Sequence, residues 1–261
     1  MTQFLTRRWA FALFLTAFLG GPSVGPVAAQ TVQEPAPKSS APVYPGDPYE
    51  DWNRKVFTFN DTVDRLALRP VAQAYRNITP DIIDRAVTNF FNNLQEVRNF
   101  TNSLLQLKGE AAIVAAGRFT YNTVFGLAGL FDVATAFDLP ERPEDFGQTL
   151  GYWGVGSGPY LMVPFLGPSN PRDFTGLGID GFVLPSPWDK AHSPETYYAF
   201  ALQVVDKRAD YIPAEGFISG DRYTFIRNAY LQRREFLIND GKVTNDPFAS
   251  DDDDDLMLED F

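Results

Sequence analysis

The chain has 261 residues, which fits one large domain, and it contains 23 Phe, one His and no Cys at a formal net charge of -11. This charge argues against nucleic acid as a partner, because phosphate binding needs clustered Lys and Arg. Without cysteine, and with His192 as the single histidine, neither a disulfide nor a thiolate or histidine-rich metal site can form. We therefore predict no metal and no cofactor.

Residues 1–29 have the pattern of a secretory signal peptide. Arg7 and Arg8 precede an apolar run from Trp9 to Leu19, and residues 27–29 (Val-Ala-Ala) form a small-residue cleavage site. The run is too short to span a membrane. An uncleaved anchor is the alternative, and the arginine pair leaves Sec and twin-arginine export both open. We expect cleavage and a mature protein outside the cytoplasm.

Both ends of the mature chain look unlike a folded domain. Residues 30–46 are rich in Pro, Ala and Ser, which predicts an extended, flexible tether. Residues 243–261 contain five consecutive aspartates, which predicts a disordered acidic tail. The folded domain is therefore expected to span 47–242.

The first half of this domain has helical periodicity. Apolar residues recur at three- and four-residue steps from Tyr49 to Leu66, which predicts an amphipathic helix with Asp47 as its N-cap and Arg69-Pro70 as its end. A second helix opens at Thr79-Pro80, with an apolar face that includes Ile83 and an opposite polar face that includes Asn99.

Further helices are predicted over 110–124, 197–209 and 225–237. Asp240-Gly241 closes the last one, with Gly as the C-terminal cap, and its Arg227 and Arg234 are expected in solvent. Since no segment shows the strict alternation of a strand, the sequence predicts an all-α fold.

The segment 124–139 is apolar apart from two aspartates. It is too short and too interrupted to cross a bilayer. Two readings remain: a buried helix pair, which the sequence alone slightly favours, or an interfacial element lying in lipid.

Five glycines lie between positions 147 and 158, among aromatic residues. The G-x-G-x-x-G phosphate fingerprint would need glycine at Pro159, and the G-x-S-x-G hydrolase elbow would need glycine at Val155. The loop is therefore either a cluster of structural turns or a flexible gate.

Several motifs together resemble one family. Residues 47–54 (Asp-Pro-Tyr-Glu-Asp-Trp-Asn-Arg) resemble the D-P-x-E-x-x-N-R start of MlaA (VacJ) proteins, and residues 118–126 resemble their R-F-x-x-N-T-x-x-G. Residues 146–160, with Phe-Gly-Gln-Thr-Leu-Gly followed by the glycine loop, are similar to the most specific signature of the family. The resemblance covers about 47–242, in the same order.

This resemblance implies a single ring-shaped domain of amphipathic helices with a Gly-rich loop and an apolar hairpin. Such proteins lie in the inner leaflet of the outer membrane, at its periplasmic face. They remove mislocalised phospholipids from the outer leaflet and pass them to a soluble periplasmic lipid-carrier protein, beside a trimeric outer-membrane porin. No covalent chemistry is involved, so the resemblance implies a transport protein and no enzyme.

The resemblance also suggests which residues meet lipid. The glycines at 154, 156 and 158 would form the base of the mobile gate, and 124–139 would contact lipid. On this basis we expect the lipid channel or gate to involve Phe59, Asn60, Asn122, Phe125, Gly126, Leu127, Leu130, Phe131, Gly154, Gly156, Gly158, Tyr160, Arg172 and Asp173. One departure is the missing lipobox cysteine, so attachment is expected to depend on an apolar rim and a porin.

Two other functions compete with transport. A phospholipase would have to use His192, or a carboxylate pair drawn from Glu141, Glu144 and Asp145, but these acids are expected in solvent. A structural or surface-spreading outer-membrane protein is the second alternative.

Overall fold

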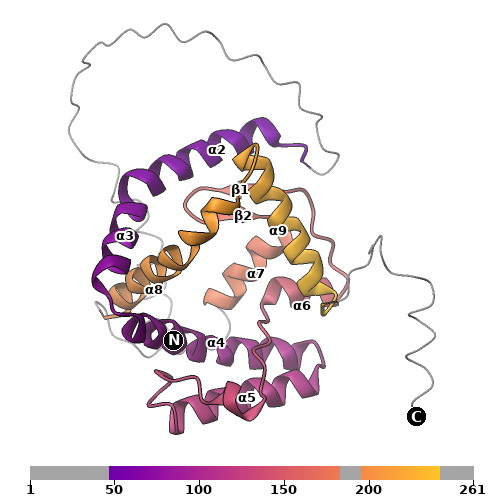
Figure 1. Cartoon of the computed structure of the whole chain (residues 1–261). Helices are drawn as coiled ribbons and strands as arrows, with labels where there is room; N and C mark the ends of the chain where they lie inside the picture. The colour runs from indigo at the N-terminus through magenta and orange to yellow at the C-terminus, as the bar shows by residue number, and fades with distance from the viewer. Residues whose placement is uncertain (1–46, 183–194, 242–261) are drawn as a thin grey trace, which may run out of the picture. The chain divides into compact units, whose positions relative to one another are not determined.

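The computed structural model describes residues 47–182 and 195–241, all of which belong to one compact unit (Figure 1). The expected signal peptide, tether and acidic tail, together with His192, lie outside the described residues.

The described part is mainly helical, which confirms the predicted class. Its helices are α2 (Glu50–Val63), α3 (Arg69–Ile78), α4 (Asp81–Leu105), α5 (Gly109–Val124), α6 (Phe146–Tyr152), α7 (Pro171–Phe182), α8 (Glu195–Tyr211) and α9 (Arg222–Ile238). One small antiparallel hairpin, β1 (Leu161–Val163) and β2 (Gly167–Ser169), pairs Met162 with Pro168. Strands of three residues are too short to show alternation, which is why the sequence did not indicate them.

The first helix does not end at Arg69-Pro70, as the sequence predicted. A π-helical turn, η1 (Asp64–Leu68), joins α2 directly to α3, and Pro70 lies in the first turn of α3. Proline lacks the N–H that continues an α-helical ladder, and the π-helical turn occupies the positions before it. The helical chain therefore bends there and continues.

Asp47 is also not the N-cap of α2, because Tyr49 occupies that position. The Asp47 carboxylate is buried instead. It accepts a hydrogen bond from Asn53 Nδ2 at 2.8 Å and another from the Tyr223 hydroxyl, and Arg227 Nη1 lies 3.5 Å away. Its role is to join the start of α2 to α9, and the expectation that Arg227 lies in solvent is wrong.

Contacts between elements form a closed circuit. They run from α2 through η1 to α3, then to α8, α4, α6 and α9, and return through the β1–β2 hairpin to α2. Helix α5 packs along α4 outside this circuit, and α7 packs on α6 (Figure 1).

The interior of this unit is unusually polar. Helix α4 shows it best: Asn99, predicted on the outer face, is 1% exposed, whereas Ile83 of the apolar face is 52% exposed. Asn99 is paired, since its Nδ2 donates to Glu96 at 3.0 Å and its Oδ1 accepts from the Glu144 amide at 3.0 Å. Buried polar groups are tolerated when they are hydrogen-bonded in this way.

The phenylalanines show the same inversion. Of the phenylalanines in the described ranges, only Phe91 and Phe146 are buried. Packing in a core therefore does not explain why the chain has as many as 23 phenylalanines. No helix within 47–182 or 195–241 has the length and apolarity needed to cross a membrane.

Candidate gate and lipid-facing site

The glycine-rich loop connects α6 to β1. Gly154 and Gly158 adopt φ values of +85° and +71°, which disfavour a side chain, and a Cβ at Gly158 would also lie 3.1 Å from the Pro171 ring. Gly156 differs from both, because its φ is not positive and a Cβ there would meet no atom within 4 Å. The conformation of the loop therefore requires glycine at 154 and 158, while glycine at 156 keeps the backbone free to move.

Arg172 is the described residue that links this loop to α7. Its side chain is nearly buried, its Nη1 lies 3.5 Å from the Val155 carbonyl oxygen, and its backbone N–H lies 3.5 Å from the Ser157 carbonyl oxygen. Both distances are at the long end for hydrogen bonds, so each bond is weak. The link from the loop to α7 is thus weak, whereas its first residues are bonded more firmly to α6, since the Gly154 and Val155 amides donate to the Gly151 and Leu150 carbonyls at 2.9 Å.

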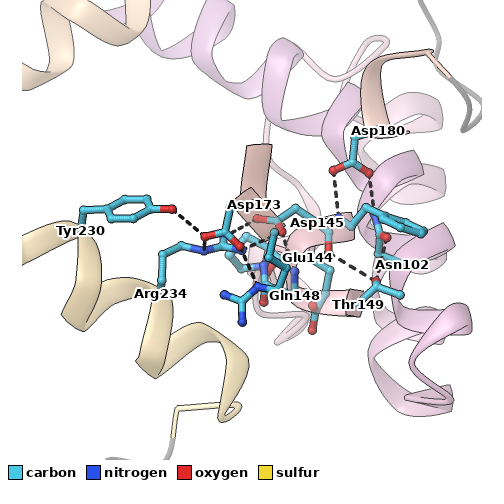
Figure 2. A network of polar contacts seen from close by, with 12 residues as sticks. Asn102, Glu144, Asp145, Gln148, Thr149, Asp173, Asp180, Tyr230 and Arg234 are labelled. Atoms are coloured by element: carbon cyan, nitrogen blue, oxygen red, sulfur yellow. Dashed lines mark hydrogen bonds and ion pairs between the residues drawn. The ribbon is translucent and has the colours of Figure 1, made fainter. Parts of the chain in front are cut away.

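Beneath the loop, two aspartates share one arginine (Figure 2). Arg234 reaches in from α9: its Nη1 lies 2.5 Å from Asp145 Oδ2, and its Nη2 lies 3.0 Å from both Asp145 Oδ1 and Asp173 Oδ1. The Tyr230 hydroxyl donates to Asp173 Oδ2 at 2.6 Å. The sequence placed Arg234 and Asp145 in solvent, and both expectations are wrong.

This arrangement sets the charge of both carboxyl groups. Burial opposes ionisation of Asp145, but hydrogen bonds and charge from Arg234 outweigh it and lower its pKa. Burial likewise opposes ionisation of Asp173, whose pKa is nevertheless lowered by the Tyr230 hydrogen bond and by Arg234. Burial and the bond to Asp173 raise the pKa of Tyr230. The network is therefore an arginine between two carboxylates.

Each aspartate also lies at the start of a helix. Asp145 caps α6 by accepting from the Gln148 amide at 2.8 Å. The Asp173 amide donates to Asn170 Oδ1 at 2.8 Å, at the start of α7. The Arg234 network therefore fixes α6, after which the glycine loop begins, to α7, which follows the β1–β2 hairpin.

A second polar layer connects α6 and α7 to α4. Asp180 accepts from the Phe146 amide at 2.9 Å and from Asn102 Nδ2 at 3.0 Å, and Thr149 Oγ1 donates to Asn102 Oδ1 at 2.9 Å (Figure 2). Glu144, expected in solvent, is buried and accepts from Gln106 Nε2 at 2.8 Å. The loop thus begins at a helix, α6, that buried hydrogen bonds join to α4 and α7.

Of the expected site residues, Tyr160 has a structural position. It is 1% exposed and packs with Val56, Met162 and Tyr223 in a small apolar core. Its ring lies between the hairpin and α9, edge-on to the rings of Tyr223 and Tyr230.

Phe59 and Asn60 form a separate group on α2. Asn60 Nδ2 donates to the Val163 carbonyl at 3.0 Å, and its Oδ1 accepts from the Phe165 amide at 2.8 Å. The Phe59 ring packs edge-on against the Phe165 ring, with centroids 5.1 Å apart. These two residues hold the turn of the β hairpin.

The expected lipid-contact residues form a third group, in the segment after α5. Phe125 is 65% exposed and Leu127 is 64% exposed, with Val124, Leu130, Phe131 and Phe137 also exposed. The segment consists of tight turns and a 3₁₀ helix, η2 (Ala134–Phe137), so the buried helix pair is wrong. A Cβ at Gly126 would lie 2.2 Å from the Phe131 carbonyl oxygen, which explains that glycine.

Polar residues anchor this apolar segment from below. Arg118 Nε lies 2.6 Å from Glu96 Oε1, and its Nη2 lies 3.2 Å from Asp132 Oδ2. Asn122 Nδ2 donates to Asp132 Oδ1 at 3.1 Å, and its Oδ1 accepts from the Ala134 amide at 2.8 Å. Arg118 was not among the expected site residues, although its place in the R-F-x-x-N-T motif was a signal for it.

The expected residues therefore fall into three groups and no single pocket. The expected site residues did not include Arg234, Tyr230 and Asn170, which all contact Asp173. Within the parts of the chain that the structure describes, no set of three or more His, Cys, Asp or Glu side chains is arranged to hold a metal ion.

Known proteins match this chain over most of its length. The family described as "MlaA lipoprotein" matches residues 45–237. Two proteins named "Intermembrane phospholipid transport system lipoprotein MlaA" are similar. That of Escherichia coli (strain K12) is 36% identical over 203 residues, or 76% of this chain and 80% of that protein. That of Haemophilus influenzae (strain ATCC 51907 / DSM 11121 / KW20 / Rd) is 34% identical over 212 residues, or 79% and 85%.

A solved structure is similar as well. It is described as "Structural basis for maintenance of bacterial outer membrane lipid asymmetry", and it superposes with a TM-score of 0.66 at 35% identity, covering 74% of this chain and 99% of that one. The agreement of family, relatives and fold leads to one conclusion: the chain belongs to the MlaA lipoprotein family.

Proposed function

We propose that this protein transports phospholipid without covalent chemistry, removing mislocalised phospholipid from the outer leaflet of the outer membrane and so maintaining lipid asymmetry. The observation that carries the proposal is the inverted distribution of polarity: a hydrogen-bonded polar interior and an exposed apolar exterior. The names of the relatives support it, since they belong to an intermembrane phospholipid transport system.

The exposed apolar side chains support a position in a membrane. Water disfavours such a surface by about 25 cal/mol per Å², so a contiguous patch is a site of protein or lipid contact. The segment from Val124 to Phe137 offers such side chains, and Asn122 and Arg118 fix its shape. We assign this segment to contact with lipid acyl chains, in the inner leaflet at the periplasmic face.

The glycine loop is proposed as the gate. A Cβ added at its central Gly156 would meet no atom within 4 Å, and its links to Arg172 are long and weak, whereas Arg234 fixes α6, from which the loop begins, to α7. A glycine-rich segment with weak contacts, next to helices that are fixed to each other, is an arrangement that suits a gate. Asn60, Asn122, Arg172 and Asp173 then act by positioning the elements around the lipid path, because their polar atoms bond to protein groups.

The finer partners are also proposals. Lipid leaving the gate would pass to a soluble periplasmic carrier protein, with a trimeric porin holding this protein in the outer membrane. Export would use the cleaved signal peptide of residues 1–29. Moving an intact lipid between two sites breaks no covalent bond, so the mechanism needs no catalytic residue.

The test compares cells that lack the gene after complementation with the wild type, Gly156→Ala or Gly156→Pro. Outer-leaflet phospholipid is measured with a surface-acting reagent on intact cells. Because space around Gly156 is open, alanine should fit and restore low outer-leaflet phospholipid, whereas proline should stiffen the loop and fail to restore it. Equal restoration by both variants, at equal protein levels, would count against a gate at this loop.

A further inference from the structure

A cavity of about 330 Å³ lies where the end of α3, the start of α4 and the end of α8 meet. Its volume is in the range of small-molecule sites. Charged side chains of both signs line it: Arg76 and Arg85 are cationic, and Asp81, Asp84 and Asp210 are anionic. This α3–α4 pocket is separate from the glycine loop and from the apolar segment after α5.

The two arginines of the pocket are not paired with other groups of the described part of the protein. Among the residues that the structure describes, neither Arg76 nor Arg85 has an ion pair or a side-chain hydrogen bond. Helix α4 also begins here without a side-chain cap. Free guanidinium groups beside an uncapped helix N-terminus are the donors that a phosphate prefers.

The acidic side chains of the pocket, in contrast, would accept hydrogen bonds from a cation. Asp84 Oδ1 is buried and accepts no hydrogen bond within the described chain. Asp210 lines the same pocket, and burial together with the nearby Asp84 carboxylate raises its pKa. An unpaired buried carboxylate oxygen is costly, and an ammonium N–H would satisfy it.

The chain beside the pocket is apolar and open. Ile78, at the end of α3, is 80% exposed, and Ile82 and Ile83, in the first turn of α4, are 65% and 52% exposed. These isoleucines flank the pocket residues Thr79 and Asp81 in sequence. A ligand with a charged end in the pocket would therefore have an apolar surface next to it.

We propose that the α3–α4 pocket binds the headgroup of a zwitterionic membrane phospholipid that bears a primary ammonium, of the phosphatidylethanolamine type. Its phosphate contacts Arg76 and Arg85, its ammonium contacts Asp84 and Asp210, and its acyl chains lie along Ile78, Ile82 and Ile83. This site is peripheral to the transport path, and it rests on the proposed function only in requiring that the protein meets a phospholipid membrane.

Photolabelling of the full chain in phosphatidylcholine vesicles tests the site. The vesicles contain a trace of phosphatidylethanolamine, phosphatidylglycerol or phosphatidylcholine with a diazirine on one acyl chain, and mass spectrometry reads the label on the peptide around Ile82. In the wild type, phosphatidylethanolamine should label this peptide most strongly, because phosphatidylglycerol lacks the ammonium and phosphatidylcholine lacks its N–H donors.

Two variants separate the halves of the site. Arg76→Gln with Arg85→Gln should lower labelling by phosphatidylethanolamine on the order of tenfold, the effect of losing charge-assisted hydrogen bonds. Asp84→Asn with Asp210→Asn should remove the preference for phosphatidylethanolamine over phosphatidylglycerol. A charge-matched control, Arg142→Gln with Arg233→Gln, changes exposed arginines elsewhere and should leave labelling unchanged. If the variant with Arg76→Gln and Arg85→Gln does not fold, Arg76→Gln alone is used in its place, because Arg76 is exposed.

Several outcomes would overturn the proposal. Equal labelling by phosphatidylglycerol in the wild type would show that the acids recognise no ammonium. Displacement by an equal concentration of soluble glycerophosphoethanolamine would make the occupant a soluble phosphate ester. If the protein associates with vesicles but carries no label near Ile82, the headgroup site is wrong and the proposed function stands. If the wild type does not associate with vesicles, both the site and the proposed function are wrong.

Discussion

The backbone of Gly176 in α7 packs directly on the backbone of Gly147 in α6. A Cβ added at Gly176 would lie 2.3 Å from the Gly147 nitrogen and 2.7 Å from its Cα. The two helices could not stay this close with any side chain at 176. This contact is what allows Asp145 and Asp173, one on each side of it, to share Arg234.

Gly176→Ala should therefore push α7 away from α6. We expect the free energy of unfolding to fall by about 1–3 kcal/mol, the cost of overpacking. Gly178→Ala is the matched control on the same helix, because nothing lies within 4 Å of its added Cβ. Alanine favours the helix over glycine by up to about 1 kcal/mol, so the control should be neutral or stabilising. Urea unfolding of both variants checks this, and equal stabilities would contradict the close packing.

Arg234→Gln should be among the most damaging single changes in the described part of the chain. It leaves Asp145 and Asp173 partly buried without their shared cation, and breaking a buried ion pair in this way costs about 3–5 kcal/mol. The pKa of both carboxyl groups should rise, and this can be followed by carboxyl NMR shifts. Arg233→Gln, at the exposed neighbouring position, should change neither property. Unshifted carboxyl pKa values in Arg234→Gln would show that another group holds the charges.

The ion pair between Arg54 and Asp221 predicts a pH dependence of stability. The hydrogen bond from Arg54 lowers the pKa of Asp221 to about 2. An unfolded aspartate titrates at about 3.9. Because the folded pKa is the lower one, the stabilisation is fully present above about pH 4 and is lost as the pH falls towards 2.

Asp221→Asn tests this charge by itself, because asparagine is as good an N-cap as aspartate for α9. The variant should be less stable than the wild type at pH 6, and the difference should shrink between pH 4 and pH 2. Since half of the Asp221 side chain is exposed, the difference should be small. Urea unfolding across this pH range measures it, and a difference independent of pH would assign the effect to capping.

The apolar segment after α5 should bind membrane without stabilising the fold. Phe125→Ser with Leu127→Ser removes two side chains that are mostly exposed in the protein, so the unfolding midpoint should stay within a few degrees of the wild type. Each side chain contributes about 1.5–3 kcal/mol if it is buried in lipid, so flotation with vesicles should weaken markedly.

Phe217→Ser with Tyr198→Ser is the control for this experiment, since both side chains are highly exposed and lie on other elements. It should reduce flotation less than the pair in the apolar segment. If the control pair proved the more damaging one, the membrane-facing surface would have to be placed near α8 and η4 (Pro213–Phe217).

The sequence by itself determined most of the helices and the glycine-rich loop, but it did not mark the non-glycine residues, such as Leu127 and Asp138, that adopt positive φ. Helical periodicity is a local property, so α5 and α8 lie near where the sequence predicts them. The predicted glycine cap of α9 is not its C-cap: Asn239 is, Asp240 follows it with φ +52°, and the Gly241 amide donates to the Phe236 carbonyl. The spacing of the glycines also marked the loop around Gly156, because glycine adopts backbone conformations that other residues disfavour.

Only the tertiary structure decided which faces are buried and which distant charges meet. Periodicity gives α4 two faces but does not say which one meets solvent, and the polar face with Asn99 turned out to be inside. Arg234 and Asp145 are 89 residues apart, so no local pattern links them. A buried ion pair depends on where helices pack, and that is set by long-range contacts such as Gly176 on Gly147.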